Sequence, residues 1–150
     1  MTIFMVRIGV LVLVSMLLVL VVWSGRRFVE AQRRRALAAV PLAFGGDMDA
    51  NASLSQVRIL AFSSDDCRQC HEMQIPALQR VLDARGSKVS IAEVDAPNSP
   101  DLTQRYRILT LPSTVIMDAA GRAHAVNYGF ANTQRLLDQV DEVLAQVSVS

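Results

Sequence analysis

Two cysteines, Cys67 and Cys70, stand three positions apart where an apolar segment gives way to a helical pattern. The apolar segment 57–62 has the length and composition of a buried strand. The helical pattern spans about 67–85 and ends at Gly86, a residue type that often follows the last turn of a helix. Its apolar positions are Met73, Ile75, Leu78, Val81 and Leu82. The chain must therefore adopt a fold in which a strand delivers a cysteine pair to the start of a helix.

The place of the pair at a helix start predicts its chemistry. Ser64, Asp65 and Asp66 are residue types that favour the N-cap. Residues i and i+3 share a helix face, so the two sulfurs can meet. The first sulfur would lie at the positive end of the helix dipole, which stabilises a thiolate and lowers the pKa of Cys67. We therefore expect Cys67 to be the nucleophile and Cys70 its resolving partner.

A second constraint is the apolar run 3–23 near the N-terminus. Its 21 residues, at about 1.5 Å each, match a hydrocarbon core of about 30 Å. Arg7 can snorkel to one interface, and Trp23 is an interfacial aromatic at the other end. A cleaved signal peptide is the alternative, but the run exceeds the usual apolar region of about 7–15 residues. The sequence thus predicts an uncleaved single-pass anchor, residues 1–24, in contact with the lipid bilayer.

Arginines cluster on the C-terminal side of this run. There are five within about a dozen residues, whereas the N-terminal side has only Arg7. They are Arg26, Arg27, Arg33, Arg34 and Arg35. The positive-inside rule then places the following domain in the cytoplasm, with the extracytoplasmic side as the alternative. The helix is expected to continue to about Ala39, because Pro41 cannot extend it.

The rest of the chain divides into a linker and one domain. Residues 25–53 are predicted to form a basic juxtamembrane helix and a linker, with a short edge strand near 42–44. The domain, residues 54–150, alternates strands and helices in the order β-α-β-α-β-β-α, typical of an α/β mixed sheet flanked by helices. After the cysteine helix we expect a strand at 89–95, a short helix at 101–106, a hairpin of strands 112–117 and 122–127 with its loop at 118–121, and a closing helix at about 132–147.

Composition narrows the function classes. The formal net charge of +1 over 150 residues gives no reason to expect nucleic acid. Two cysteines are too few for a disulfide-scaffolded miniprotein. A metal site from Cys67, Cys70, His71 and His124 is disfavoured, since the spacing of His124 fits no familiar finger. We expect neither a metal nor a cofactor.

In these features the chain resembles the thioredoxin superfamily over residues 54–147. The resemblance rests on the Cys67-Arg68-Gln69-Cys70 unit, on the segment 106–113 with Pro112, and on the hairpin glycine followed by Gly129 and an amphipathic helix. It implies a thioredoxin-like fold, a cis Pro112 facing the disulfide, and a groove that binds substrate through Thr110, Leu111, Pro112 and Gly129. A proline that opens a strand also lacks the N–H that a ladder would need.

The chain departs from the thioredoxin pattern at four places. Asp66 stands where thioredoxins carry tryptophan, and Ala61 where they bury an acid that helps move a proton. Pro76 lies one residue later than the helix proline of thioredoxin, and Arg68-Gln69 replaces Gly-Pro. Asp66 opposes thiolate formation, whereas Arg68 favours it. Without the acid, water, His71 or Glu72 would have to move the proton. We expect Asp66, Arg68 and His71 to modulate the pair.

The predicted function is thiol–disulfide exchange with a protein or small-molecule disulfide, supported by a reductase or another thiol donor. One alternative is a tethered adaptor that keeps the fold and binds without turnover. Another is c-type haem attachment, whose pattern the run Cys67-Arg68-Gln69-Cys70-His71 also matches. The arginine cluster and the alternating strands and helices argue against haem attachment.

Several other residues have predicted structural places. His71 is expected to be solvated and His124 to be exposed on the hairpin. Met73 and Met117 are expected in the core, because methionines fill apolar interiors more often than they act as ligands. Asp95 is expected to cap the end of its strand.

Overall fold

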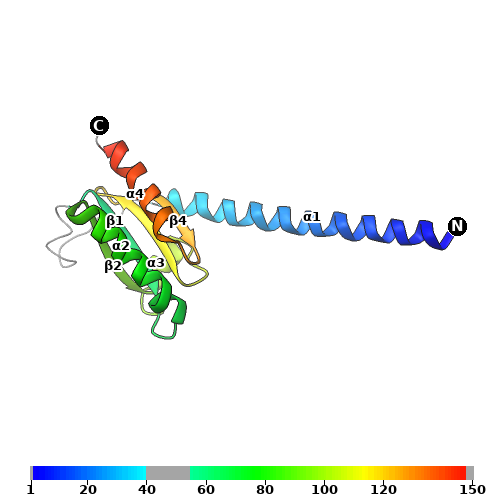
Figure 1. The fold of residues 1–150 in the computed structure, drawn as a ribbon, viewed down its shortest axis with the longest axis horizontal. Coiled ribbons are helices and arrows are strands. Elements are labelled where there is room, and N and C mark those ends of the chain that lie inside the picture. The colour runs from blue at the N-terminus through cyan, green and yellow to red at the C-terminus, as the bar shows by residue number, and fades with distance from the viewer. Residues whose placement is uncertain (1, 40–54, 148–150) are drawn as a thin grey trace. The chain divides into compact units, whose positions relative to one another are not determined.

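The computed structural model describes residues 2–39 and 55–147 of the chain (Figure 1). Contacts divide the chain into two compact units, Met1–Arg34 and Arg35–Ser150. The predicted linker, for residues 40–53, and the edge strand expected near 42–44 lie outside the described residues. The domain boundaries at 24 and 53 remain predictions.

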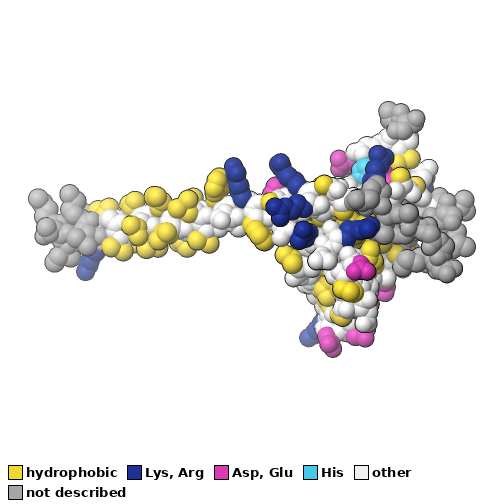
Figure 2. Space-filling view, turned by 180° about the vertical axis from the view of Figure 1, so that it is seen from behind, with side chains coloured by type: hydrophobic (Ala, Val, Ile, Leu, Met, Phe, Trp, Pro, Cys, Tyr) yellow, Lys and Arg dark blue, Asp and Glu magenta, His cyan; other side chains and the backbone are white. Residues whose placement is uncertain are grey.

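The first unit is most of helix α1, Thr2–Leu37. Arg7–Leu37 is long and apolar enough to cross a membrane, by length and composition. Hydrophobic side chains cover most of its length in Figure 2. At the end of the apolar run the Arg27 guanidinium lies 4.5 Å from the centre of the Trp23 ring, as a cation–π pair. The helix ends two residues before the predicted Ala39.

The second unit is built on a four-stranded sheet in the order β2-β1-β3-β4. Its strands are β1 Val57–Ser63, β2 Val89–Asp95, β3 Ser113–Asp118 and β4 Ala123–Tyr128. β1 pairs parallel with β2 and antiparallel with β3, and β3 pairs antiparallel with β4. The sheet is therefore mixed, as predicted.

Three helices accompany the sheet: α2 Ile75–Arg85, α3 Pro100–Arg105 and α4 Thr133–Val147. α2 and α4 pack on one face, where Ile59 and Ala61 of β1 join their apolar stripes. The opposite face buries Leu60 and Phe62 against Tyr106, which follows α3. Successive residues of β1 thus point into different cores, as the period of two in a strand requires. β1 is buried on both faces and forms the centre of the domain.

The helix after the cysteines differs from the prediction in its first turn. A π-helical turn, η2 Cys70–Gln74, precedes α2, and a 3-10 turn, η3 Gly86–Lys88, follows it. A π turn takes up one more residue than an α turn. Met73 lies in this turn and is 45% exposed, so its predicted place in the core was wrong.

The other elements agree with the prediction within one or two residues. Gly86 ends α2 with a φ of +54°, a conformation suited to glycine. Asp118, predicted in the hairpin loop, is the last residue of β3. Met117 is fully buried, as predicted. Asp95 accepts a hydrogen bond from Asn98 at the end of β2.

Candidate redox site

The segment between β1 and the helix is held by backbone hydrogen bonds. Cys67 N–H donates to Ser64 O (3.0 Å) and Arg68 N–H to Asp66 O (3.1 Å). Ala96 N–H donates to Ser63 O at 2.9 Å and ties the start of the segment to the end of β2. The tight turn places Cys67 directly before the helix, as the sequence predicts. The cap of η2, however, is made without a side-chain hydrogen bond.

The two cysteines form a disulfide, with an S–S distance of 2.05 Å and Cα atoms 5.3 Å apart. Their surroundings differ. Cys67 is partly exposed, whereas Cys70 is 1% exposed. The Cys70 N–H is shared between Cys67 O at 3.0 Å and Cys67 Sγ at 3.2 Å, so a backbone dipole points partly at the accessible sulfur. A thiol from solution can reach Cys67 and is excluded from Cys70.

Strand register brings Pro112 to the same end of the sheet. Phe62 pairs with Ser113, so the residues before Ser113 lie beside the end of β1 that leads to Cys67. The Leu111–Pro112 bond is cis, as the resemblance implied. Ser113 Oγ donates to Thr110 O at 2.7 Å and steadies the turn. Within residues 55–147, the Leu111 backbone has no hydrogen-bond partner. Its N–H and C=O are available to an extended chain.

Gly129 completes this end of the sheet. Ser113 pairs with Tyr128, so Gly129 follows β4 at the edge where β3 begins. Its φ is +84°, and a Cβ placed on it would meet no atom within 4 Å. The space in front of Gly129 is therefore open. Leu109, two residues before Leu111, is 71% exposed, which is unusual for a large apolar side chain.

The predicted modulating residues Asp66, Arg68 and His71 are all exposed. Arg68 Nε donates to Glu72 Oε1 at 2.7 Å. His71 Nε2 lies 3.3 Å from Asp65 O and is exposed, as predicted. Asp66 is exposed. The guanidinium of Arg68 is thus occupied by a carboxylate, which weakens its field at the sulfur.

No buried acid stands below the disulfide among the described residues. Ala61 is 5% exposed and belongs to the core under α2 and α4. The buried carboxylate of the domain is Asp118, 3% exposed. It pairs with Val57, at the opposite end of β1 from Cys67. Asp118 therefore cannot exchange a proton with either cysteine directly.

Two polar clusters escaped the sequence analysis. Gln74 is 3% exposed and bonds to the backbone of Ala131. His124, wrongly predicted as exposed, is only 26% exposed in its side chain and lies 3.0 Å from Asp118 Oδ2. Arg122 Nε donates to the same oxygen at 2.9 Å. The alternation Asp118, Arg122, His124 across a short loop is the signal that could have revealed this second cluster.

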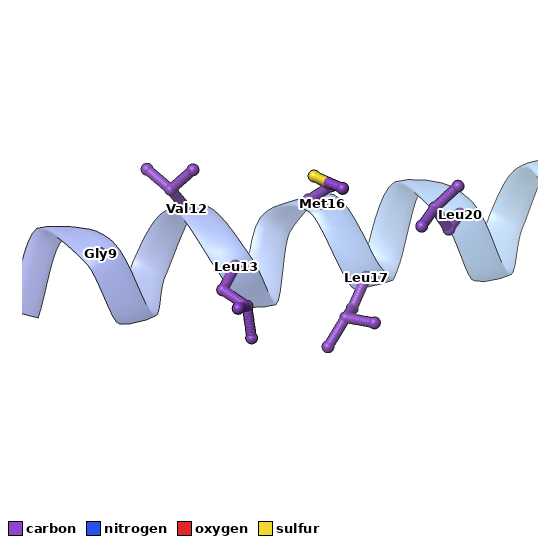
Figure 3. A pocket seen from close by; sticks show the side chains of 6 residues that line it. All are labelled: Gly9, Val12, Leu13, Met16, Leu17 and Leu20. Carbon is purple, nitrogen blue, oxygen red and sulfur yellow. The ribbon is translucent and has the colours of Figure 1, made fainter.

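A shallow groove on α1 is lined by apolar side chains and a glycine. Figure 3 shows its side chains, all apolar, along the helix. They are Val12, Leu13, Met16, Leu17 and Leu20, beside Gly9. Such a surface suits acyl chains or another apolar helix and holds no group for catalysis.

Comparisons with known proteins identify the family and the fold of the domain. The thioredoxin family model matches residues 47–142. Thioredoxin of Alicyclobacillus acidocaldarius subsp. acidocaldarius is 28% identical over 78 residues, which are 52% of this chain and 72% of that protein. The structure of chloroplastic thioredoxin z is 27% identical, with a TM-score of 0.54 over 64% of this chain and 85% of that one. Mitochondrial thioredoxin 3 of Saccharomyces cerevisiae, in its oxidised form, shares the fold at 22% identity, with a TM-score of 0.52 over 61% of this chain and 82% of that one.

The fold and the disulfide-forming Cys67–Cys70 pair define a thiol–disulfide redox domain. The chain belongs to the thioredoxin family.

Proposed function

We propose that the protein is a membrane-anchored disulfide reductase or redox-relay protein. The observation that carries the proposal is the unequal burial of the pair, since Cys67 is partly exposed and Cys70 is 1% exposed. Exchange requires one sulfur that a substrate can reach and one that is shielded until the intermediate forms. The hydrogen bond from Cys70 N–H to Cys67 Sγ supports the same roles, because it would stabilise a thiolate on Cys67.

The proposed reaction has two steps. The Cys67 thiolate of the reduced protein attacks a substrate disulfide, forms a mixed disulfide and releases one substrate thiolate. The Cys70 thiol then loses its proton and attacks the Cys67 sulfur. The Cys67–Cys70 bond forms, the bond to substrate breaks, and the second substrate thiolate leaves. Two electrons pass to the substrate, and its two sulfurs take up two protons. A cellular reductase or another thiol donor restores the reduced pair.

The groove beside the pair fits an extended substrate. Thr110, Leu111 and Pro112 would align its backbone, with the open Leu111 N–H and C=O as hydrogen-bond partners. The space in front of Gly129 would receive its other side. Asp66, Arg68 and His71 would modulate the thiolate by their charge and polarity.

We further propose that residues 1–24 anchor the protein, that 25–53 connect the anchor to the domain, and that residues 54–150 form the redox domain. The arginine cluster after the span favours a cytoplasmic domain. The cytoplasm would keep the pair reduced. The donor would then be a cytoplasmic reductase.

Turnover of a protein disulfide tests the reaction. The full chain in detergent should accelerate reduction of insulin by dithiothreitol. Cys67→Ser should reduce the rate to background, and Cys70→Ser should accumulate mixed disulfides with substrate. A wild-type protein that binds substrate without turnover would instead support the tethered adaptor. A Cys67→Ser protein with wild-type turnover would refute the mechanism.

Thiol labelling of intact cells tests the orientation. A membrane-impermeant alkylating reagent should modify the protein only after the membrane is breached. The chain has only two cysteines, so labelling has one interpretation. Labelling of intact cells would refute the cytoplasmic placement, and a requirement for prior reduction would indicate a resting disulfide on the outer side.

A further inference from the structure

The turn that carries Cys70 is braced from one side by a buried side chain. Gln74 is 3% exposed, whereas His71, Glu72 and Met73 between it and Cys70 are exposed. Cys70 and Gln74 are the two buried residues of η2 and lie on the same face of the turn. Gln74 therefore lies one turn after Cys70, on the same buried face of η2.

Both polar atoms of the Gln74 amide bond to the same residue, Ala131. Its Nε2 donates to Ala131 O at 3.3 Å, and its Oε1 accepts from Ala131 N–H at 3.0 Å. Ala131 is 0% exposed and lies two residues after Gly129. A side-chain amide bonded to both backbone groups of one residue is fixed in position and orientation. It connects the turn of Cys70 to the segment that follows the substrate groove.

The hydrogen bonds between Gln74 and Ala131 hold a turn that is π-helical. Its wider ring is less favourable than that of an α-helix, and such turns occur as single interruptions, often at functional sites. The turn begins at Cys70, whose N–H lies 3.2 Å from Cys67 Sγ. In η2 the Cys70 carbonyl accepts from Ile75 N–H, so a relaxation of η2 into α-helix would give this carbonyl another partner and shift the Cys70 backbone relative to Cys67.

We propose that Gln74 is a positioning residue for disulfide exchange. Braced on Ala131, it holds η2 so that the Cys70 N–H points at the Cys67 sulfur and the Cys70 sulfur stays within reach of it. The inference rests on the proposed function. In the reduced protein the N–H stabilises the Cys67 thiolate. In the second step the fixed turn keeps Cys70 ready to attack the mixed disulfide at Cys67.

Gln74→Met tests the proposal, because it keeps the volume of the side chain and removes both hydrogen bonds. Gln139→Met is the matched control. Gln139 forms a reciprocal amide pair with Asn127, at 2.8 and 3.1 Å, and this pair includes no residue of η2. Gln74→Glu is a milder variant, since a carboxylate still accepts from Ala131 N–H but cannot donate to Ala131 O. Thermal unfolding establishes that each variant folds.

Two properties of the full chain in detergent are measured. The first is the titration midpoint of the Cys67 thiol, followed by thiolate absorbance. The second is ring closure after reduced protein is mixed with oxidised glutathione, followed by release of the second glutathione thiol. In that step Cys70 displaces glutathione from Cys67, the Cys67–Cys70 bond forms, and glutathione leaves as thiolate.

We expect Gln74→Met to raise the titration midpoint of Cys67 by about half a pH unit and to slow ring closure about fivefold. Effects of this size correspond to the loss of one hydrogen bond, here the one from Cys70 N–H to Cys67 Sγ. Gln74→Glu should fall between it and wild type, and Gln139→Met should match wild type. A Gln74→Met protein with wild-type titration and closure would overturn the inference. Equal slowing of ring closure by Gln139→Met would also overturn the inference, because a general loss of packing in the domain would then explain the slower closure. Failure of the wild type to reduce insulin refutes the proposed function separately, since both measurements need only the cysteine pair and glutathione.

Discussion

The two ends of the sheet satisfy their polar groups in opposite ways. At one end the buried carboxylate of Asp118 accepts from Arg122 N–H, Arg122 Nε and His124 Nε2 at about the ideal distance, 3.0, 2.9 and 3.0 Å. At the other end the Leu111 backbone has no partner within the described part of the domain. The polar groups of one end are satisfied within the domain, whereas the Leu111 backbone at the other end is not.

Apolar exposure follows the same division. Leu109 and Met73, at the cysteine end, are 71% and 45% exposed. Residues of the closed end, such as Val57 and Met117, are fully buried. An unpaired backbone edge beside exposed apolar side chains is stable only if water or a partner covers it. Stability and exchange should therefore depend mainly on different ends of the sheet.

The largest expected effect on stability is at the closed end. Asp118→Ala removes the acceptor of three hydrogen bonds from a 3% exposed site and should cost about 2 kcal/mol of unfolding free energy. The exposed Asp66→Ala, at the cysteine end, is the control and should change it by less than about 0.5 kcal/mol. Urea unfolding of reduced protein measures both. Asp118→Ala should reduce insulin at the wild-type rate under native conditions. A large loss of this activity would mean that exchange also depends on the closed end.

The same carboxylate predicts a pH dependence. Burial raises the pKa of Asp118, but hydrogen bonds from His124 and Arg122 outweigh it, so the pKa lies below its usual value. Because the folded pKa is lower than the unfolded one, the stabilisation is present above the unfolded pKa and is lost as pH falls through the folded pKa. The stability difference between wild type and Asp118→Asn should thus shrink on acidification below about pH 4. A difference that stays constant down to about pH 2 would contradict the assignment.

The sequence was enough to predict the features that depend on residues close together in the chain. The Cys67–Cys70 pair, the proline at the start of β3 and the glycine after β4 all occur at fixed places relative to apolar strands. Strand register then brings them together at one end of the sheet. The order of elements follows from the same alternation of strands, turns and helices.

Patterns failed where a contact joins distant segments or where a helix departs from the regular period. The spacing of Met73 fits an α-helix, yet the π turn η2 leaves its side chain exposed. His124 looked exposed because its partner, Asp118, was assigned to the loop instead of β3. Gln74 had no visible role, since Ala131 lies 57 residues away.

Two glycines with positive φ lie at opposite ends of the sheet. Gly129 (φ +84°) lies at the cysteine end, and Gly86 (φ +54°) precedes β2 at the closed end. A Cβ added to either glycine would meet no atom within 4 Å, so alanine adds strain without a clash. Gly129→Ala should cost about 1 kcal/mol of unfolding free energy. Gly86→Ala should cost more, because the ψ of −135° at Gly86 lies outside the left-handed helical region.

Only Gly129→Ala should also alter exchange. Its methyl group would enter the space in front of the groove, and KM for insulin should rise while the rate with oxidised glutathione stays the same. Gly86→Ala should leave both unchanged. Equal KM values for the two variants would remove Gly129 from the substrate groove.

The smallest expected effect concerns the exposed pair Arg68–Glu72. The side chains are 86% and 59% exposed, and a solvated pair of this kind contributes less than about 0.5 kcal/mol to stability. Its influence on Cys67 should be electrostatic and opposite for the two partners. Glu72→Gln frees the guanidinium and should speed the attack of Cys67 on oxidised glutathione, whereas Arg68→Gln leaves an unpaired carboxylate and should slow it. Each change should be about twofold at low salt and should vanish near 1 M salt, where the screening length is only about 3 Å.

The double variant should match wild type within error, because the pair contributes little net charge. A salt-independent change would instead mean that Arg68 or Glu72 acts by shaping the helix start, and the open end would then owe its reactivity to backbone geometry alone.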